Sequence, residues 1–69
     1  MKLKLPELRL AVKHLRNSSQ FASAVSSMYF DAGDGIAAAR LNELASRLDA
    51  EREIIERRIA KAPGGADRD

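Results

Sequence analysis

The stretch SSMYFDAGDGIAAAR, from Ser26 to Arg40, decides the fold because it predicts a turn between two helices. Gly33 can adopt the left-handed backbone conformation that commonly closes a helix. Asp34 follows it and is a residue type that caps the first turn of the next helix. Met28, Tyr29 and Phe30 stand just before this turn, so bulky side chains gather at the tip of a hairpin.

On the N-terminal side of the turn, apolar and small residues recur every three or four positions, which predicts a helix over about residues 6–31. The predicted seam is Leu8, Ala11, Leu15, Ser18, Ala22, Val25 and Tyr29. Pro6 suits the first helical turn, where its missing N–H is no loss. Asn17, Ser18 and Ser19 are poor residues inside a helix, so a kink or a break near Ser18 is the alternative.

On the C-terminal side, a second helix is predicted over about residues 36–62. Its apolar stripe is Ala37, Leu41, Leu44, Leu48, Ile55, Ile59 and Ala62. Charged residues of opposite sign lie four apart outside the stripe, as in Glu43 and Arg47, which is typical of an exposed helical face. Pro63 and the two glycines after it end the helix, and we expect residues 63–69 to be a disordered tail.

The two helices have similar lengths and a short linker, turn 32–35, so they must fold back on each other. This predicts an all-α fold, an antiparallel two-helix hairpin over residues 1–62. With Tyr29 beside Ala37, small residues face large ones: Val25 faces Leu41, Ala22 faces Leu44, Ser18 faces Leu48, and Leu15 faces Glu51 and Arg52. Such complementarity favours interdigitating side chains. We expect Arg52 to form a partly buried ion pair with Glu51 or Glu56 that fixes the register.

The apolar surface of the first helix is wider than one partner helix can cover. A second arc adjoins the seam and consists of Leu10, His14, Asn17, Phe21, Ala24 and Met28. In a monomer its large side chains would face water. We therefore expect a homodimer with four helices around a common core, with Leu10, His14, Phe21 and Met28 in the dimer interface. A docking surface for another protein is the alternative.

Composition narrows the classes of function. A chain of 69 residues forms one small domain whose core needs reinforcement, and it has no cysteine and one histidine, His14. We expect no metal, no cofactor and no catalytic constellation, hence no enzyme, and we interpret His14 as a hydrogen-bonded interface residue. The chain has no apolar run of membrane-spanning length, so we expect no membrane contact and a cytoplasmic location.

Two groups of residues are the candidate partner-binding sites. Met28, Tyr29 and Phe30 either cap the end of the bundle or act as an aromatic anchor for a partner. Arg9, Lys13 and Arg16 form a basic stripe that is either a solvated face or a means of steering the chain toward an acidic surface. No aromatic residue lies between these cations, which argues against single-stranded nucleic acid, and we do not expect a nucleic-acid partner.

The hairpin layout and the Ala- and Arg-rich helix IAAARLNELASRLDAEREIIERR resemble the quorum-sensing anti-activator family of Pseudomonas phages. Members of that family are small helical homodimers. The resemblance implies a phage-encoded inhibitor, acting in the host cytoplasm, that binds a LuxR-type transcription factor and the type IV pilus assembly ATPase. The resemblance covers residues 6–62 in size, layout and composition, and it implies no individual functional residue.

Two other formats are similar. Rop-like plasmid regulators are hairpin dimers that bind paired RNA loops, and they need a cationic face across the dimer. The co-chaperones of type III secretion needle proteins are hairpins that shelter a partner helix, and they need an open apolar groove. Here Arg9, Lys13 and Arg16 would supply the first, and Leu10, Phe21 and Met28 the second.

Overall fold

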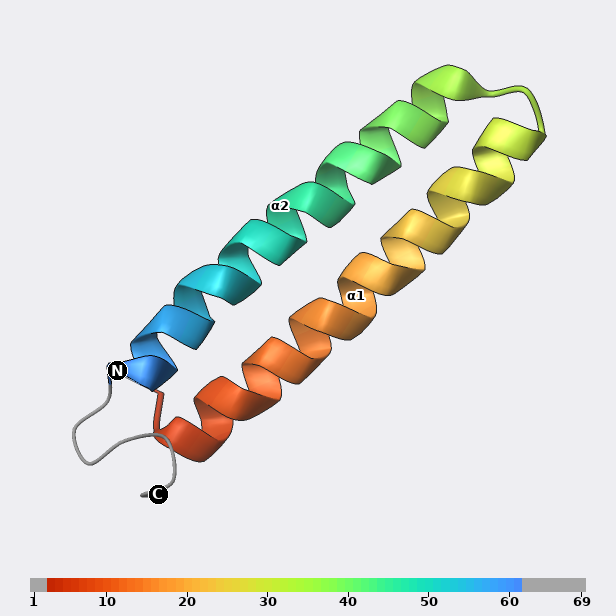
Figure 1. The fold of residues 1–69 in the computed structure, drawn as a ribbon. Coiled ribbons are helices and arrows are strands. Elements are labelled where there is room, and N and C mark those ends of the chain that lie inside the picture. Colours follow the sequence, from red (N-terminus) through yellow and green to blue (C-terminus); the bar gives the residue numbers. More distant parts are fainter. Residues whose placement is uncertain (1–2, 62–69) are drawn as a thin grey trace.

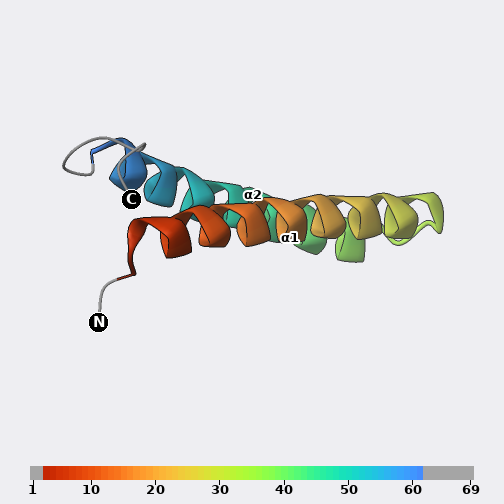
Figure 2. The ribbon, with the colours of Figure 1, turned by 90° about the horizontal axis from the view of Figure 1, so that it is seen from below.

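The fold is an antiparallel pair of long helices, seen in a computed structural model that describes residues 3–61. Helix α1 spans Leu5–Asp31 and helix α2 spans Gly35–Ala60, and the chain measures 50 × 20 × 13 Å (Figure 1). The turn lies at one end of this rod, and the helices cross at a shallow angle along its length (Figure 2). The predicted all-α hairpin is confirmed. The predictions for Ala62 and for residues 63–69 lie outside the described residues.

Helix α1 is continuous through its polar middle. Pro6 occupies the first turn, and the carboxylate of Glu7 accepts a hydrogen bond from the backbone N–H of Lys4 at 2.7 Å. The alternative of a break near Ser18 is wrong, because Leu5–Asp31 is one uninterrupted helix. The side chain of Ser19 finds a partner on α2, described below, so it does not compete with the α1 backbone.

The turn has the geometry that its residue types predict. Gly33 has a φ of 87°, a conformation that favours glycine, and its N–H donates to the carbonyl of Phe30 at 3.0 Å. The N–H of Asp34 donates to the carbonyl of Tyr29 at 2.8 Å. The side chain of Asp34 then accepts from the N–H of Ala37 at 3.0 Å and caps α2. Both predicted roles, for Gly33 and Asp34, are confirmed.

Small residues bring the two helices together near the turn. The hydroxyl of Ser26 donates to the backbone carbonyl of Ala38 at 2.6 Å, and that of Ser19 donates to the carbonyl of Ala45 at 3.2 Å. A serine hydroxyl is only two bonds from its own backbone, so the backbones of α1 and α2 approach closely at both places. Ser19, Ala22, Ser26, Ala38 and Ala45 are the buried residues of the described chain.

The seam predicted from hydropathy is therefore wrong by one residue on each helix near the turn. Ser19 and Ser26 face α2 in place of Ser18 and Val25, and Ala45 faces α1 in place of Leu44. Close approach selects small side chains for the contact and moves larger ones to its edge, so Val25 is 38% and Leu44 is 44% exposed. Tyr29, also predicted in the seam, is 43% exposed.

Toward the open end of the hairpin the contact is made by larger side chains that are only half-buried. These are Leu5, Leu8, Val12 and Leu15 of α1 and Leu48, Arg52, Ile55 and Ile59 of α2. No large side chain among residues 3–61 is fully buried. The core is thin, as expected for two helices that touch along a single line.

Candidate functional site

Three exposed large apolar side chains of α1 lie on the side away from α2. Phe21 is 71% exposed, Met28 is 68% exposed and Leu10 is 52% exposed. His14, Asn17 and Ala24, which complete the predicted second arc, are exposed as well. All six belong to α1, and we call this set the outer seam. The structure thus leaves each predicted dimer-interface residue accessible, although the dimer itself stays a prediction.

The outer seam does not adjoin the contact with α2 but lies almost opposite to it. At about 100° per residue, the mean direction of the outer seam differs from that of the α2-facing residues by roughly 160°. The sequence-based expectation of adjoining arcs followed from the wrong choice of Val25 and Tyr29 as seam residues. With Ser19 and Ser26 facing α2 instead, α1 has two opposed contact surfaces, and α2 covers only one.

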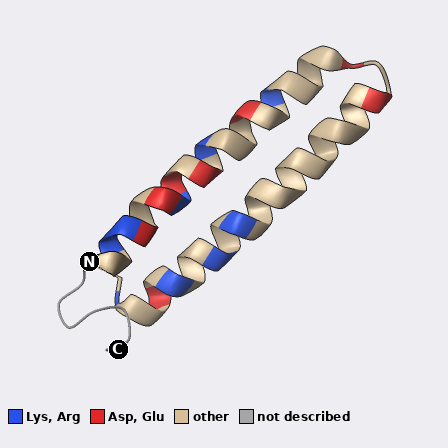
Figure 3. Ribbon diagram, viewed as in Figure 1, with Lys and Arg blue, Asp and Glu red and all other residues tan. Residues whose placement is uncertain are grey.

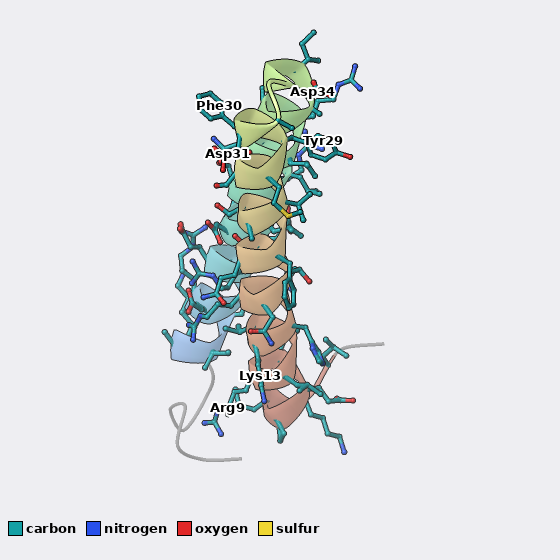
Figure 4. The ribbon with its side chains drawn as sticks, turned by 90° about the vertical axis from the view of Figure 1, so that its right-hand side faces the viewer. Arg9, Lys13, Tyr29, Phe30, Asp31 and Asp34 are labelled. Atoms are coloured by element: carbon teal, nitrogen blue, oxygen red, sulfur yellow. The ribbon has the colours of Figure 1, made fainter. Side chains whose placement is uncertain are left out.

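The three bulky residues at the tip point in different directions. Tyr29 and Phe30 lie on opposite sides of α1 (Figure 4). Tyr29 lines a shallow apolar depression together with Val25 and Met28. Phe30 is 71% exposed and lies beside a shallow depression between the helices that is lined mostly by small and polar side chains. None of the three is buried as a cap on the end of the hairpin.

The basic stripe lies apart from the tip. Arg9 and Lys13 lie near the open end of the hairpin, whereas Tyr29 and Phe30 lie beside the turn (Figure 4). Arg16 pairs with an acidic residue of α2, Glu56, at 3.6 Å. The structure therefore does not bring the two predicted partner-binding groups together at one end of the hairpin.

Arg16 of the basic stripe joins an ion-pair network on α2. Arg52 is a seam residue with a side chain that is 20% exposed, and it donates to Glu56 at 2.8 Å. It also lies 3.8 Å from Asp49, so its partners are Glu56 and Asp49 rather than Glu51. Glu56 joins Arg52 and Arg16. The Nε atom of Arg52 is buried without a hydrogen-bond partner, which makes this charge costly to keep in the seam.

We expect Arg52→Leu to stabilise the hairpin by about 1 kcal/mol, because a leucine fills the seam without a buried unpaired N–H, and a buried ion pair is often no better than an apolar replacement. Urea unfolding followed by circular dichroism measures the change. The control is Arg47→Leu on the exposed side of α2, which should change stability by less than about 0.5 kcal/mol. A loss of stability in Arg52→Leu beyond that of the control would contradict the prediction.

Other classes of site have no support in the part of the chain that is described. Residues 3–61 contain no group of three or more His, Asp or Glu side chains placed to hold a metal ion. Neither described helix has the length of apolar sequence needed to cross a membrane.

Sequence reasoning missed Ser19 and Ser26 as contact residues. The available signal was their spacing of seven residues, matched by the same spacing of Ala38 and Ala45 on α2, because small residues one heptad apart mark a line of close approach. A hydropathy pattern does not detect such residues.

Comparisons with protein-family models, curated proteins and solved structures give no significant match to this chain. The resemblance to the phage anti-activator family gains no support from them, and the functional argument rests on the geometry of the hairpin.

Proposed function

We propose that this hairpin is a non-catalytic protein-binding module that self-associates and inhibits a larger protein by covering one of its surfaces. The observation that carries the proposal is the outer seam, where Phe21 and Met28 are each about 70% exposed on the side of α1 away from α2. Exposed apolar side chains that gather on one side of a helix are typical of interaction surfaces.

The dimer supplies the reinforcement that the thin core needs. Two helices in contact along one line bury too little apolar surface to make a chain of this size very stable, and the outer seam offers more surface of the same kind. Pairing of two outer seams would give an arrangement of four helices with the tips still accessible.

The proposed partner is a regulatory protein of the host, in the first place a LuxR-type transcription factor and in the second the pilus assembly ATPase. This partner class follows from the resemblance of layout and composition. The tip suits the role because Tyr29 and Phe30 present aromatic surface on two sides of α1 (Figure 4), and aromatic side chains anchor protein interfaces at low entropic cost.

Inhibition by occlusion requires that DNA binding by a purified LuxR-type regulator is lost as the hairpin approaches stoichiometric amounts. We expect Tyr29→Ala combined with Phe30→Ala to raise the required concentration at least about tenfold, because two anchors of about 1–2 kcal/mol each are removed. Arg47→Ala on α2 is the matched surface control and should inhibit like the wild type. Equal inhibition by the double variant would remove the tip from the interface.

The RNA-binding alternative has less support. Arg16 is paired with Glu56, so the α1 stripe is partly neutralised by α2 and does not form a continuous cationic face. Binding of paired RNA loops by the wild type, without any effect on the regulator, would favour that alternative over our proposal.

A further inference from the structure

The geometry of the dimer can be derived from α1, and we infer that two copies pair through their outer seams as antiparallel helices, α1 against α1, with α2 on the outside of each. This inference rests on the self-association proposed above and adds which helix makes the contact, in which direction and in which register.

The outer seam has the residue spacing of a coiled coil. Its residues occur at intervals of four, three, four, three and four from Leu10 to Met28, which is the alternation of a coiled-coil seam. No charged residue interrupts it. Helix α1 therefore has two heptad seams: α2 occupies the inner one, and the outer one is free along five turns of the described helix.

Helix α2 has no comparable second seam. Its exposed large apolar residues, Ile36, Leu44 and Ile54, are eight and ten residues apart. Arg40, Arg47 and Glu51 lie between them, so a partner that covered this side of α2 would bury charges. A bundle in which both helices of each copy face the centre is therefore disfavoured, and contact through α1 avoids that cost.

The distribution of charge along α1 favours one relative direction of the two α1 helices. The half of α1 before Asn17 carries three basic residues, Arg9, Lys13 and Arg16, against Glu7 alone, whereas residues 17–30 carry no charge, as the tan half of α1 beside the turn shows (Figure 3). A parallel pair would place the two basic halves at the same end of the dimer, with both copies of Lys13 at the same level. In an antiparallel pair each Lys13 lies beside the uncharged half of the other copy, one turn from its Asp31, so repulsion is replaced by attraction.

In one antiparallel register, every residue of the outer seam pairs with an outer-seam residue of the second copy. Leu10 pairs with Met28 of the second copy, His14 with Ala24, and Asn17 with Phe21. The His14–Ala24 and Asn17–Phe21 layers each join a larger residue to a smaller one, Leu10 and Met28 form an apolar layer, and the twofold axis passes at the level of Ser19.

This arrangement gives different roles to the tip residues on the two sides of α1. Met28 is covered by Leu10 of the second copy, while Phe30, on the other side of α1 from Tyr29, remains outside. Because the helices are antiparallel, the two tips lie at opposite ends of the dimer. Each dimer therefore presents two separate tip surfaces, and we expect it to bind two partner molecules.

Cysteine crosslinking tests the direction and register, since the natural chain has no cysteine. Lys13→Cys, Gln20→Cys and Ser27→Cys place a thiol on one flank of the outer seam, seven residues apart. With a short bis-maleimide we expect Gln20→Cys to form covalent dimers by itself. Lys13→Cys and Ser27→Cys should not, because equivalent positions in the two copies are about 18 and 24 Å apart along the axis. When the Lys13→Cys and Ser27→Cys variants are refolded together, with one of them carrying a mass tag, we expect the crosslinked product to contain one copy of each.

Light scattering on the uncrosslinked wild type separates the outcomes. Efficient crosslinking of Lys13→Cys with itself would contradict the antiparallel register, in which these positions are about 18 Å apart along the axis, and would overturn the inference. A dimer by light scattering without crosslinking at position 20 would place the contact on another face and would also overturn it, while leaving self-association intact. A monomer at micromolar concentration would remove both the inference and the dimer that it rests on.

Discussion

Phe21→Glu is expected to convert the protein from a dimer to a monomer, with a dissociation constant raised by roughly 10²–10⁴ (about 3–6 kcal/mol). Burying a phenylalanine side chain contributes about 1.5–3 kcal/mol, and a symmetric interface contains it twice. Phe21 lies two residues from the inferred twofold axis at Ser19, so the two introduced carboxylates would also be close to each other. Sedimentation equilibrium over micromolar concentrations measures the change.

The chain offers a matched control in Phe30. Phe21 and Phe30 are both 71% exposed and both belong to α1, so a glutamate at either position replaces an equally exposed aromatic side chain with a carboxylate. Phe30 lies outside the outer seam, and we expect Phe30→Glu to remain dimeric. Circular dichroism at low temperature checks that both variants keep their helices. Equal loss of the dimer in the two variants would show that the outer seam is not the interface.

The two phenylalanines also show how far the sequence predicts the candidate site. A projection of α1 places Phe21 with Leu10 and Met28, because that grouping depends only on the period of the helix. Where the group lies relative to α2 depends on which residues α2 touches, and the sequence-based choice of Val25 and Tyr29 was wrong. That single error placed the two surfaces of α1 side by side instead of opposite each other.

The turn was predictable for a different reason. Gly33 and Asp34 act through backbone geometry within a few residues, and such local preferences do not depend on the rest of the fold. The partners of Arg52 were less predictable, because whether Asp49 or Glu51 reaches the guanidinium depends on the rotation of α2 in the contact. A partner protein leaves no local pattern of this kind, so its class comes from the layout of the hairpin and stays a proposal.

Ser26→Leu is expected to have the largest effect on the stability of the hairpin, a loss of about 1–3 kcal/mol. Ser26 is 8% exposed, and its hydroxyl lies 2.6 Å from the carbonyl oxygen of Ala38 on the facing helix. A leucine at this position cannot fit between backbones this close without pushing α1 and α2 apart. In a chain of this size, each kcal/mol corresponds to a change in Tm of about 4–8 °C, so thermal unfolding followed by circular dichroism resolves the effect.

Two further variants separate size from hydrogen bonding. Ser26→Ala removes the bond to Ala38 but adds no volume, and because the Ala38 carbonyl keeps its place in the α2 backbone, we expect a loss of about 1 kcal/mol or less. Ser27→Leu introduces the same side chain at the exposed neighbouring position, where leucine's better helix propensity offsets any cost. All variants are compared at one protein concentration, because self-association contributes to apparent stability. If Ser26→Leu unfolded at the same temperature as Ser27→Leu, small residues would not set the distance between the helices. The rotation of α1 that turns the outer seam away from α2 would then lose its physical cause.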